Sequence, residues 1–234
     1  MGNGSAGRPS VTVHYAQTLD GRIATRTGQS RWISGDASLR LAHRLRAEHE
    51  AVLVGVGTVV ADNPRLTVRL VPGRSPLRVV ADSTLRLPLD AHVLVDAAAR
   101  TLVATTRRAS EERLSAVRRR GAGVLVVEED ARGRVDLAVL LGQLRALGIA
   151  SLLVEGGREV ITSVFQAGLV DRLVVCIAPK IVGAGVEAVG DLGISHLGEA
   201  LTFEETAVTR MGEDIVFEGR PAPRPSALGR EGEG

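Results

Sequence analysis

Apolar and polar positions alternate along this chain in short blocks that fit two different periods. Six blocks are short and apolar and end in glycine or polar turn residues, which predicts buried strands. They span residues 11–17, 51–57, 77–83, 101–106, 123–129 and 151–157. A seventh apolar block, residues 171–183, predicts a long strand that is interrupted by Pro179.

Four blocks between these strands have apolar residues at helical spacing. They span residues 36–49, 110–120, 136–148 and 157–168. Asp36, Ser110 and Asp136 stand at three of the N-terminal ends, where a side-chain oxygen accepts hydrogen bonds from free backbone N–H groups. Gly148 and Gly168 are predicted to end the last two helices.

The order of these blocks predicts an α/β fold with a mostly parallel central sheet and helices on both faces. Two further strands, residues 201–212 and 213–219, meet at Gly212 and predict a C-terminal antiparallel hairpin. In such sheets ligands bind beyond the carboxyl ends of the strands, so a site is expected there. The expected strand ends are at Ala16, Gly55, Ser83, Thr105 and Glu155.

Composition indicates how many domains the chain forms, in which compartment it lies and which partners are excluded. The 234 residues are 44% hydrophobic, enough for one substantial domain, which we expect over residues 10–220. Residues 1–9 and 221–234 are rich in glycine, proline and charge and are expected to be disordered. No apolar run reaches ~18 residues and the N-terminus lacks a signal core, so we expect a cytoplasmic protein with no membrane partner.

Charge and motif content exclude several classes of function. The net charge of +2 is dispersed and aromatic residues make up 2%, so no nucleic-acid partner is expected. The single cysteine excludes a disulfide framework. No HExxH, Walker, GxSxG or zinc-deaminase motif is present, so no metal site is expected. The five histidines are His14, His43, His49, His92 and His196.

The segment "LLVEGGREV", residues 152–160, places an acid and two glycines at a predicted strand end. Glycines permit close approach of a ligand to the backbone, and the following helix presents free N–H groups that suit a phosphate. A glycine-assisted turn before a helix explains the same residues without a ligand. The pattern lacks the GxGxxG fingerprint, so it does not predict a Rossmann domain.

Two further segments gather polar side chains after predicted strands. "VGVGTVVADNPRLTVR", residues 54–69, holds Thr58, Asp62 and Arg69, and arginine binds phosphate in a bidentate fork. An ordinary surface loop explains it equally. "AQTLDGRIATRTGQSRWIS", residues 16–34, holds the only tryptophan, Trp32, either as a packing residue or against a cofactor ring.

Together these segments resemble the reductase domain of riboflavin biosynthesis. Six motifs fall in family order: "TLDGRIAT", "GQSRWIS", "LVGVGTVVADNPRLTVR", "LLVEGG", "QAGLVDRL" and "APKIVG". They extend from about residue 11 to residue 219. The resemblance implies a dihydrofolate-reductase-like three-layer sandwich, the cofactor NADPH and a homodimer.

The resemblance also implies roles for individual residues. Cofactor-binding positions are Ala16, Trp32, Thr58, Asp62, Ser83, Gly156, Gly157, Arg158, Glu159, Val160, Ile161, Thr162 and Ser163. Substrate-binding positions are Ser30, Arg46, Leu66, Arg69 and Glu155. The arginines suit the ribose 5-phosphate and Glu155 suits the polar pyrimidine. Glu155 and His14 are the expected catalytic side chains, and no general acid is assigned.

The implied reaction is NADPH-dependent reduction of the ribosyl group of a phosphorylated 6-ribosylamino-pyrimidine to a ribitylamine. Whether the pyrimidine is deaminated stays open, and so does another pathway's pyrimidine. The alternatives are reduction of a folate-like pterin and a non-catalytic NADPH-binding regulator. One departure from the family is His14, where bacterial bifunctional members usually carry lysine. Histidine titrates near neutral pH, so this change is expected to affect the pyrimidine accepted or the pH optimum.

Overall fold

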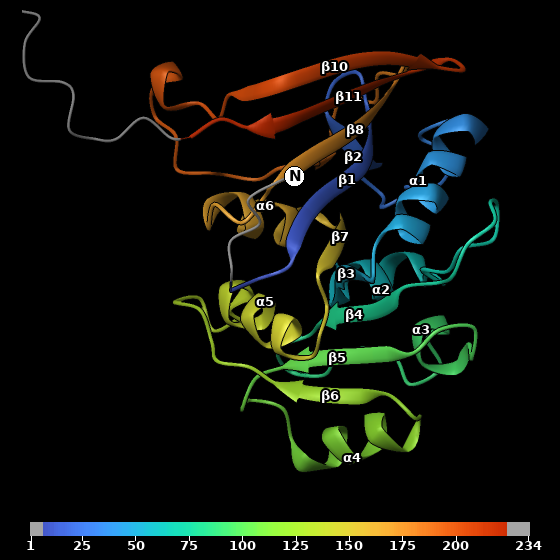
Figure 1. Ribbon diagram of the computed structural model, residues 1–234, viewed down its shortest axis with the longest axis vertical. Helices are drawn as coiled ribbons and strands as arrows, with labels where there is room; N and C mark the ends of the chain where they lie inside the picture. The colour runs from blue at the N-terminus through green and yellow to red at the C-terminus, as the bar shows by residue number, and fades with distance from the viewer. Residues whose placement is uncertain (1–6, 224–234) are drawn as a thin grey trace, which may run out of the picture.

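The computed structural model describes residues 7–223, and a nine-stranded sheet runs through its middle (Figure 1). The strand order is β10-β11-β8-β1-β7-β3-β4-β5-β6. The strands are β1 (Ser10–Thr18), β3 (Ala51–Gly55), β4 (Leu77–Ala81), β5 (Thr101–Thr105), β6 (Gly123–Val126), β7 (Ser151–Gly156), β8 (Arg172–Ala178), β10 (Phe203–Met211) and β11 (Asp214–Pro221). All neighbouring pairs from β8 to β6 are parallel, so the predicted mostly parallel sheet is confirmed.

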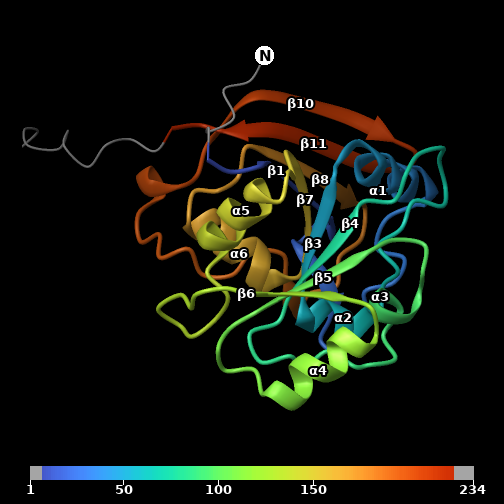
Figure 2. The same cartoon turned by 60° about the horizontal axis from the view of Figure 1, so that its bottom comes forward.

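Helices cover both faces of the sheet and make three layers, as predicted (Figure 2). One face carries α5 (Leu137–Ala146) and α6 (Arg158–Gln166). The other carries α1 (Asp36–Glu48), α2 (Val56–Asp62), α3 (His92–Val95) and α4 (Glu111–Arg119). A short 3₁₀ turn, η1, spans Leu197–Glu199.

The two cores follow from the period of two in the strands, which sends successive side chains to opposite faces. Val11 and Val13 of β1 are fully buried under α5 and α6. His14, which follows Val13, is buried as well and points to the opposite face, with Val174 of β8 as its neighbour in register. The strand pattern therefore decides that His14 lies on the α1 side of the sheet.

The helix ends test the predicted caps. Ser110 and Asp136 accept hydrogen bonds from the first-turn N–H groups of α4 and α5, as predicted. Asp36 is wrong as a cap: Gly35 is the cap residue, and it has no side chain with which to accept. Asp214 of β11 anchors this end of α1 instead, because its Oδ2 accepts from Gly35 N at 2.8 Å and from Ser38 Oγ at 2.5 Å.

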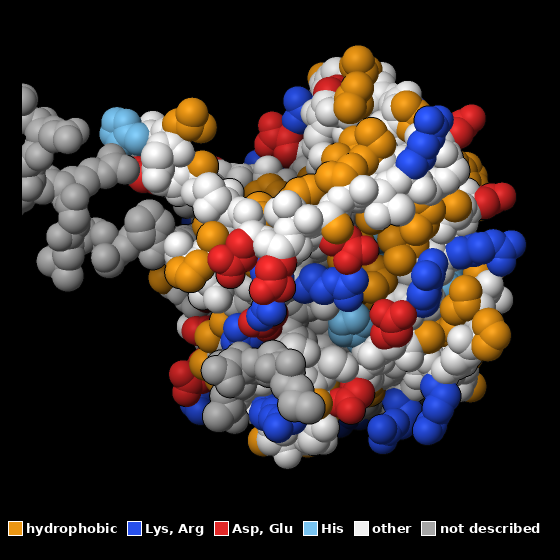
Figure 3. Space-filling model, turned by 45° about the horizontal axis from the view of Figure 1, so that its top comes forward, with side chains coloured by type: hydrophobic (Ala, Val, Ile, Leu, Met, Phe, Trp, Pro, Cys, Tyr) orange, Lys and Arg blue, Asp and Glu red, His pale blue; other side chains and the backbone are white. Residues whose placement is uncertain are grey.

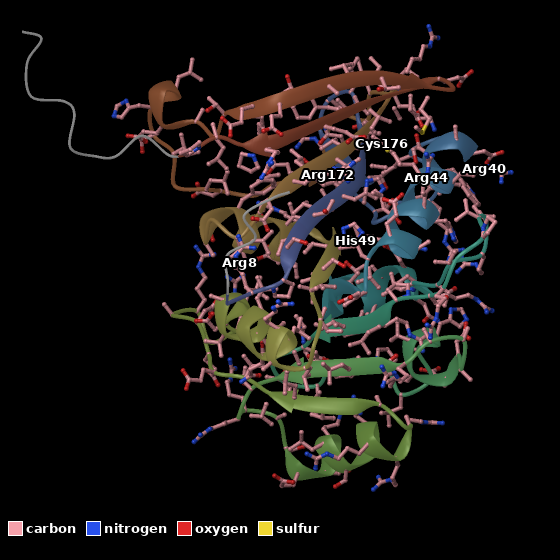
Figure 4. The ribbon with its side chains drawn as sticks, in the orientation of Figure 1. Arg8, Arg40, Arg44, His49, Arg172 and Cys176 are labelled. Atoms are coloured by element: carbon pink, nitrogen blue, oxygen red, sulfur yellow. The ribbon has the colours of Figure 1, made fainter. Side chains whose placement is uncertain are left out.

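Helix α1 has one face toward the sheet and one toward solvent. Leu41 and Leu45 are buried against the sheet. Arg40 and Arg44, one residue before each of them, point away from the sheet (Figure 4). This amphipathic packing fixes the rotation of α1, and it places Arg46 at the side of the helix that borders the sheet's carboxyl edge.

The C-terminal hairpin closes one edge of the sheet. Strands β10 and β11 are antiparallel and turn at Gly212, as predicted. β11 pairs with β8, so β8 has no open edge. β8 ends at Ala178, before Pro179, and the segment that follows pairs with an N-terminal loop instead: β9 (Gly185–Glu187) joins β2 (Arg22–Thr25) in a small antiparallel sheet that the sequence did not predict.

The expected disordered ends lie largely outside residues 7–223. Within them, Arg8 lies beside the start of β1 (Figure 4) and forms two hydrogen bonds with Asp171, at 2.6 and 2.8 Å. No helix in the described residues is long and apolar enough to cross a membrane.

Candidate active site

A cleft of about 1420 Å³ lies along the carboxyl edge of the sheet. Its walls come from the ends of β1, β3, β4 and β7, from the starts of α2 and α6, and from one side of α1. Four of the five predicted strand ends line it, and Thr105 does not, because its side chain is fully buried. The expectation that ligands bind beyond the carboxyl ends of the strands therefore predicted the position of the cleft.

The structure brings most of the predicted site residues into this cleft. Those that line it are His14, Ala16, Ser30, Trp32, Arg46, Thr58, Asp62, Arg69, Ser83, Glu155, Gly156, Gly157, Arg158, Glu159, Val160, Ile161 and Ser163. Leu66 and Thr162 do not line it. Leu66 is buried in the core on the α1 side. Thr162 turns inward, donating to Arg158 O and accepting from Gly190 N.

A buried ion pair forms the floor at one end. Arg46 of α1 donates to both oxygens of Glu155, at the end of β7, with N–O distances of 2.6 and 2.7 Å. The two side chains are only 13% and 10% exposed. Burial alone raises the pKa of Glu155, but the charge and hydrogen bonds of Arg46, with His14 and His43, outweigh burial and lower that pKa. Glu155 is therefore a carboxylate at neutral pH, and a negative charge is fixed beneath the cleft.

Two buried histidines flank this pair, and both are neutral at pH 7. The ring Nδ1 of His14 lies 3.1 Å from Val174 O, and a carbonyl only accepts, so Nδ1 carries the proton. Burial lowers the pKa of His14 despite the nearby Glu155. His43 Nδ1 accepts from Arg69 N at 2.8 Å, and burial together with Arg46 and Arg69 lowers its pKa to about 4.

The other arginine expected at the substrate is less constrained. Arg69 donates to Thr67 Oγ1 at 2.6 Å and forms no ion pair with a carboxylate among residues 7–223. Burial is the largest cause that lowers the pKa of Arg69; the charges of Arg46 and Arg65 lower it further, and Asp96 opposes them. Arg69 thus lies close to two other guanidinium groups. Such a place attracts an anion. Arg46, in contrast, is already held by Glu155 and by Thr67 O.

A glycine-lined cradle lies next to the ion pair. Gly156 has a φ of +105°, which favours glycine, and a Cβ on Gly157 would meet Thr58 Oγ1 at 3.0 Å. Helix α6 begins directly afterwards with no side-chain cap on its first-turn N–H groups. Free N–H groups beside glycines fit a phosphate or pyrophosphate, so the residues present suit a dinucleotide.

Two loops form the roof of the cleft. Ser30 donates to Asp62 Oδ1 at 2.6 Å, which joins the loop before α1 to the end of α2. Trp32 is 70% exposed and adopts a φ of 66°. Lys180, the only lysine, donates to the carbonyls of Trp32 and Ile33 at 2.6 and 2.8 Å. Trp32 therefore lines the cleft from a loop whose backbone is held by Lys180.

One part of the cleft wall was missed by the sequence analysis. Residues 132–135, which follow β6, line the far end together with Arg86 and Arg108. Ser83 fixes this loop, because its hydroxyl accepts from Val135 N at 3.0 Å. No group of histidine, cysteine and acidic side chains in the described residues is arranged to hold a metal ion.

A parallel-sheet edge with a glycine cradle, a bare helix N-terminus and a buried carboxylate–arginine pair defines a class: enzymes that hold a dinucleotide against a small polar substrate. A family model described as the RibD C-terminal domain matches residues 9–217. The chain belongs to this family.

Relatives and solved structures agree with the family. The riboflavin biosynthesis protein RibD of Aquifex aeolicus is 43% identical over 211 residues, 90% of this chain and 57% of that protein. The 2,5-diamino-6-ribosylamino-4(3H)-pyrimidinone 5′-phosphate reductase of Methanothermobacter thermautotrophicus is 43% identical over 217 residues, 90% of this chain and 97% of that protein. The chain thus spans somewhat over half of the RibD relative and nearly all of the archaeal reductase.

A crystal structure of the deaminase/reductase of Thermotoga maritima shares this fold, with a TM-score of 0.76 and 31% identity over 92% of this chain and 57% of that one. Acinetobacter baumannii RibD gives a TM-score of 0.80 and 28% identity, covering 94% and 60% of the two chains. The predicted family and its fold are confirmed.

Proposed function

We propose that this protein is an NADPH-dependent reductase of a phosphorylated 6-ribosylamino-pyrimidine in riboflavin biosynthesis. The observation that carries the proposal is one continuous cleft with a glycine cradle next to a buried carboxylate and to Arg69, which has no carboxylate partner among residues 7–223. The cradle suits the pyrophosphate of the cofactor. The carboxylate suits the N–H groups of a pyrimidine. Arg69 suits the ribose 5-phosphate.

The chemistry asks the protein mainly to position its reactants. The ring-opened substrate has a C=N bond at the first sugar carbon; reduction adds a hydride to that carbon and a proton to the nitrogen, and the cofactor when bound supplies the hydride. Glu155 orients the pyrimidine and, being ionised, does not donate the proton. Arg46 holds Glu155 in place from α1. Fixing the reacting atoms in this way accounts for much of the rate in such sites.

An activity test separates this function from its alternatives. The protein is incubated with NADPH and either the pyrimidine phosphate, in its 2-amino or 2-oxo form, or dihydropterins, while the NADPH absorbance is followed. Oxidation of NADPH with a pyrimidine phosphate is expected. Oxidation only with a pterin supports a folate-like reductase instead. Binding of NADPH without turnover of any candidate supports a non-catalytic regulator.

We also propose a homodimer, formed through the β10–β11 hairpin. Strand β8 offers no edge to a partner, because β11 covers it. The outer strand β10 remains unpaired on one side in residues 7–223, and apolar side chains gather along this part of the surface (Figure 3). Val208 and Ile215 are 69% and 44% exposed there. A monomer mass by light scattering at micromolar concentration rejects the dimer.

A further inference from the structure

The cleft extends well beyond the glycine cradle. From β7, which ends in Glu155 and the cradle, the sheet edge continues through β3 and β4 to β5 and β6. Neighbouring strands lie ~4.8 Å apart, so the loop after β6 stands roughly 19 Å from the end of β7. A dinucleotide with its pyrophosphate at the cradle and its nicotinamide toward Glu155 would extend its adenosine half toward the ends of β4 and β5.

Arginines gather at this far end. Arg86, Arg108, Arg132 and Arg134 all line it. Arg134 is committed, since it pairs with Asp130 and with Glu159 at 3.1 Å each. Neither Arg108 nor Arg132 forms an ion pair with any of the described carboxylates. These two guanidinium groups are exposed and carry charge that the protein does not neutralise by direct pairing.

The loop that carries Arg132 is held in one conformation by hydrogen bonds. Asp130 accepts from the backbone N–H groups of Arg132 and Arg134, both at 2.9 Å, and Gly133 turns the chain with a φ of +71°. Arg108 Nη1 donates to Gly133 O at 2.9 Å, so the first residues after β5 are tied to the turn after β6. This contact uses one N–H of the Arg108 guanidinium.

We propose that Arg108 and Arg132 bind the 2′-phosphate on the adenosine ribose of NADPH and so make the enzyme selective for NADPH over NADH. This inference rests on the proposed function. A phosphate monoester is a dianion near neutral pH, and a pair of guanidinium groups matches its oxygens. NADH has a hydroxyl at that place and gains nothing from the two charges.

Arg107 provides a matched control. It is adjacent to Arg108 in sequence and is also exposed, but it does not line the cleft. Arg107→Ala removes the same charge from the same loop without touching the proposed phosphate site. A long-range loss of positive potential affects both variants alike, whereas a direct contact affects only Arg108→Ala.

The test measures dissociation constants of NADP⁺ and NAD⁺ by isothermal titration calorimetry, so no turnover is needed. Arg108→Ala and Arg132→Ala are each expected to weaken NADP⁺ binding about tenfold, and the double variant more, with NAD⁺ affinity changed less than about twofold. Arg107→Ala is expected to leave both constants within about twofold. Melting temperatures confirm that each variant is folded.

Several results overturn the inference. Equal affinity of the wild-type protein for NADP⁺ and NAD⁺ removes the selectivity but leaves the reductase function standing if pyrimidine-dependent oxidation is observed. A parallel loss of NADP⁺ and NAD⁺ binding in the variants means that the arginines support the fold of the cleft rather than the phosphate. Failure of the wild-type protein to bind either dinucleotide overturns the proposed function itself.

Discussion

The two ends of the cleft handle charge in opposite ways. At the α1 end, Arg46 and Glu155 are buried, paired within 2.7 Å and flanked by two neutral histidines. At the β6 end, Arg108 and Arg132 are exposed on a turn and unpaired within the described chain. The α1 end presents side chains whose hydrogen bonds are already fixed, and the β6 end presents positive charges that have no carboxylate partner in the described chain.

This difference indicates which features of a ligand each end of the cleft can distinguish. A buried carboxylate with fixed partners acts at low effective dielectric, so it rewards one arrangement of donors and penalises others. Exposed guanidinium groups recognise the presence of a phosphate and tolerate small displacements, and salt screens them over ~8–10 Å. We therefore expect the choice of substrate to depend on geometry and the choice of cofactor to depend on charge.

The largest effect is expected from breaking the buried pair. Glu155→Gln keeps the size and one acceptor but leaves Arg46 buried without its counter-ion, which costs about 3–5 kcal/mol of unfolding free energy. It also removes the charge of the proposed acceptor for the pyrimidine, so kcat/KM is expected to fall about tenfold to a hundredfold. Thermal denaturation and steady-state kinetics measure the two losses.

The exposed pair Glu205–Arg220 supplies the control for that experiment. Glu205→Gln is expected to change stability by less than about 1 kcal/mol and to leave activity unchanged. A stable and fully active Glu155→Gln variant contradicts the contrast between the two ends. Loss of stability with full activity limits Glu155 to a structural role.

Arg69 tests whether the substrate end also has a free charge. Arg69→Ala is expected to raise KM for the pyrimidine phosphate by about tenfold or more, because a charge-assisted hydrogen bond contributes about 1.5–3 kcal/mol. The melting temperature is expected to change little, since Arg69 has no carboxylate partner in the described chain to leave unpaired. Arg74, an exposed arginine outside the cleft, is the matched control. An unchanged KM means that the phosphate lies elsewhere.

The buried histidines make stability depend on pH. His43 has a folded-state pKa of about 4 against an ordinary value of 6.5, so the unfolded chain binds the proton first as pH falls. Its contribution is complete above pH 6.5 and is lost between 6.5 and about 4, at up to about 1.4 kcal/mol per pH unit. Denaturation series at several pH values measure this slope.

His43→Asn isolates that contribution, because asparagine retains an acceptor for Arg69 N but does not titrate. The slope between pH 6.5 and 4 is expected to decrease in this variant. His196, an exposed histidine outside the cleft, serves as the control, and His196→Asn is expected to leave the slope unchanged. An unaltered slope in His43→Asn assigns the acid sensitivity to other groups.

The smallest expected effect concerns His14. Its Nδ1 faces Val174 O, so Nε2 of the neutral ring is an acceptor, which suits an amino group better than a carbonyl. His14→Lys replaces that acceptor with a cationic donor. The ratio of kcat/KM for the 2-amino over the 2-oxo pyrimidine is expected to fall about fivefold, or about 1 kcal/mol. His14→Gln, which retains an acceptor, is expected to leave the ratio within about twofold, and equal ratios in all three proteins exclude contact with this group.

The regular elements were predictable where the pattern was local. The strands and the helices α1, α4, α5 and α6 show clear periods in the sequence. Helix α2 was missed because its seven residues begin within a glycine-rich strand end. β2 and β9 were missed because neither strand is buried and each exists only by pairing with the other.

Most of the residues that line the cleft were indicated by the sequence, but the pairing of Arg46 with Glu155 was not. "LLVEGGREV" indicated Glu155 and the glycines, because the strand end and the turn are both local features. No local sequence pattern indicates that the guanidinium of Arg46, 109 positions earlier, forms an ion pair with Glu155. The loop after β6 carried a usable signal: the rule that sites lie at carboxyl strand ends applies to residues 123–129 as well, and it leads directly to Arg132.

The carboxylate that anchors the start of α1, through Gly35 N and Ser38 Oγ, comes from Asp214 in the last strand. Helix α1 carries Arg46, and Arg46 holds the Glu155 side chain in place. During synthesis the N-terminal part of a chain emerges first. Here the start of the first helix is anchored only after the last strand has been made, so in a nascent or C-terminally truncated chain the helix that carries the partner of Glu155 lacks this anchor. The final hairpin thus sets the time at which the cleft is assembled.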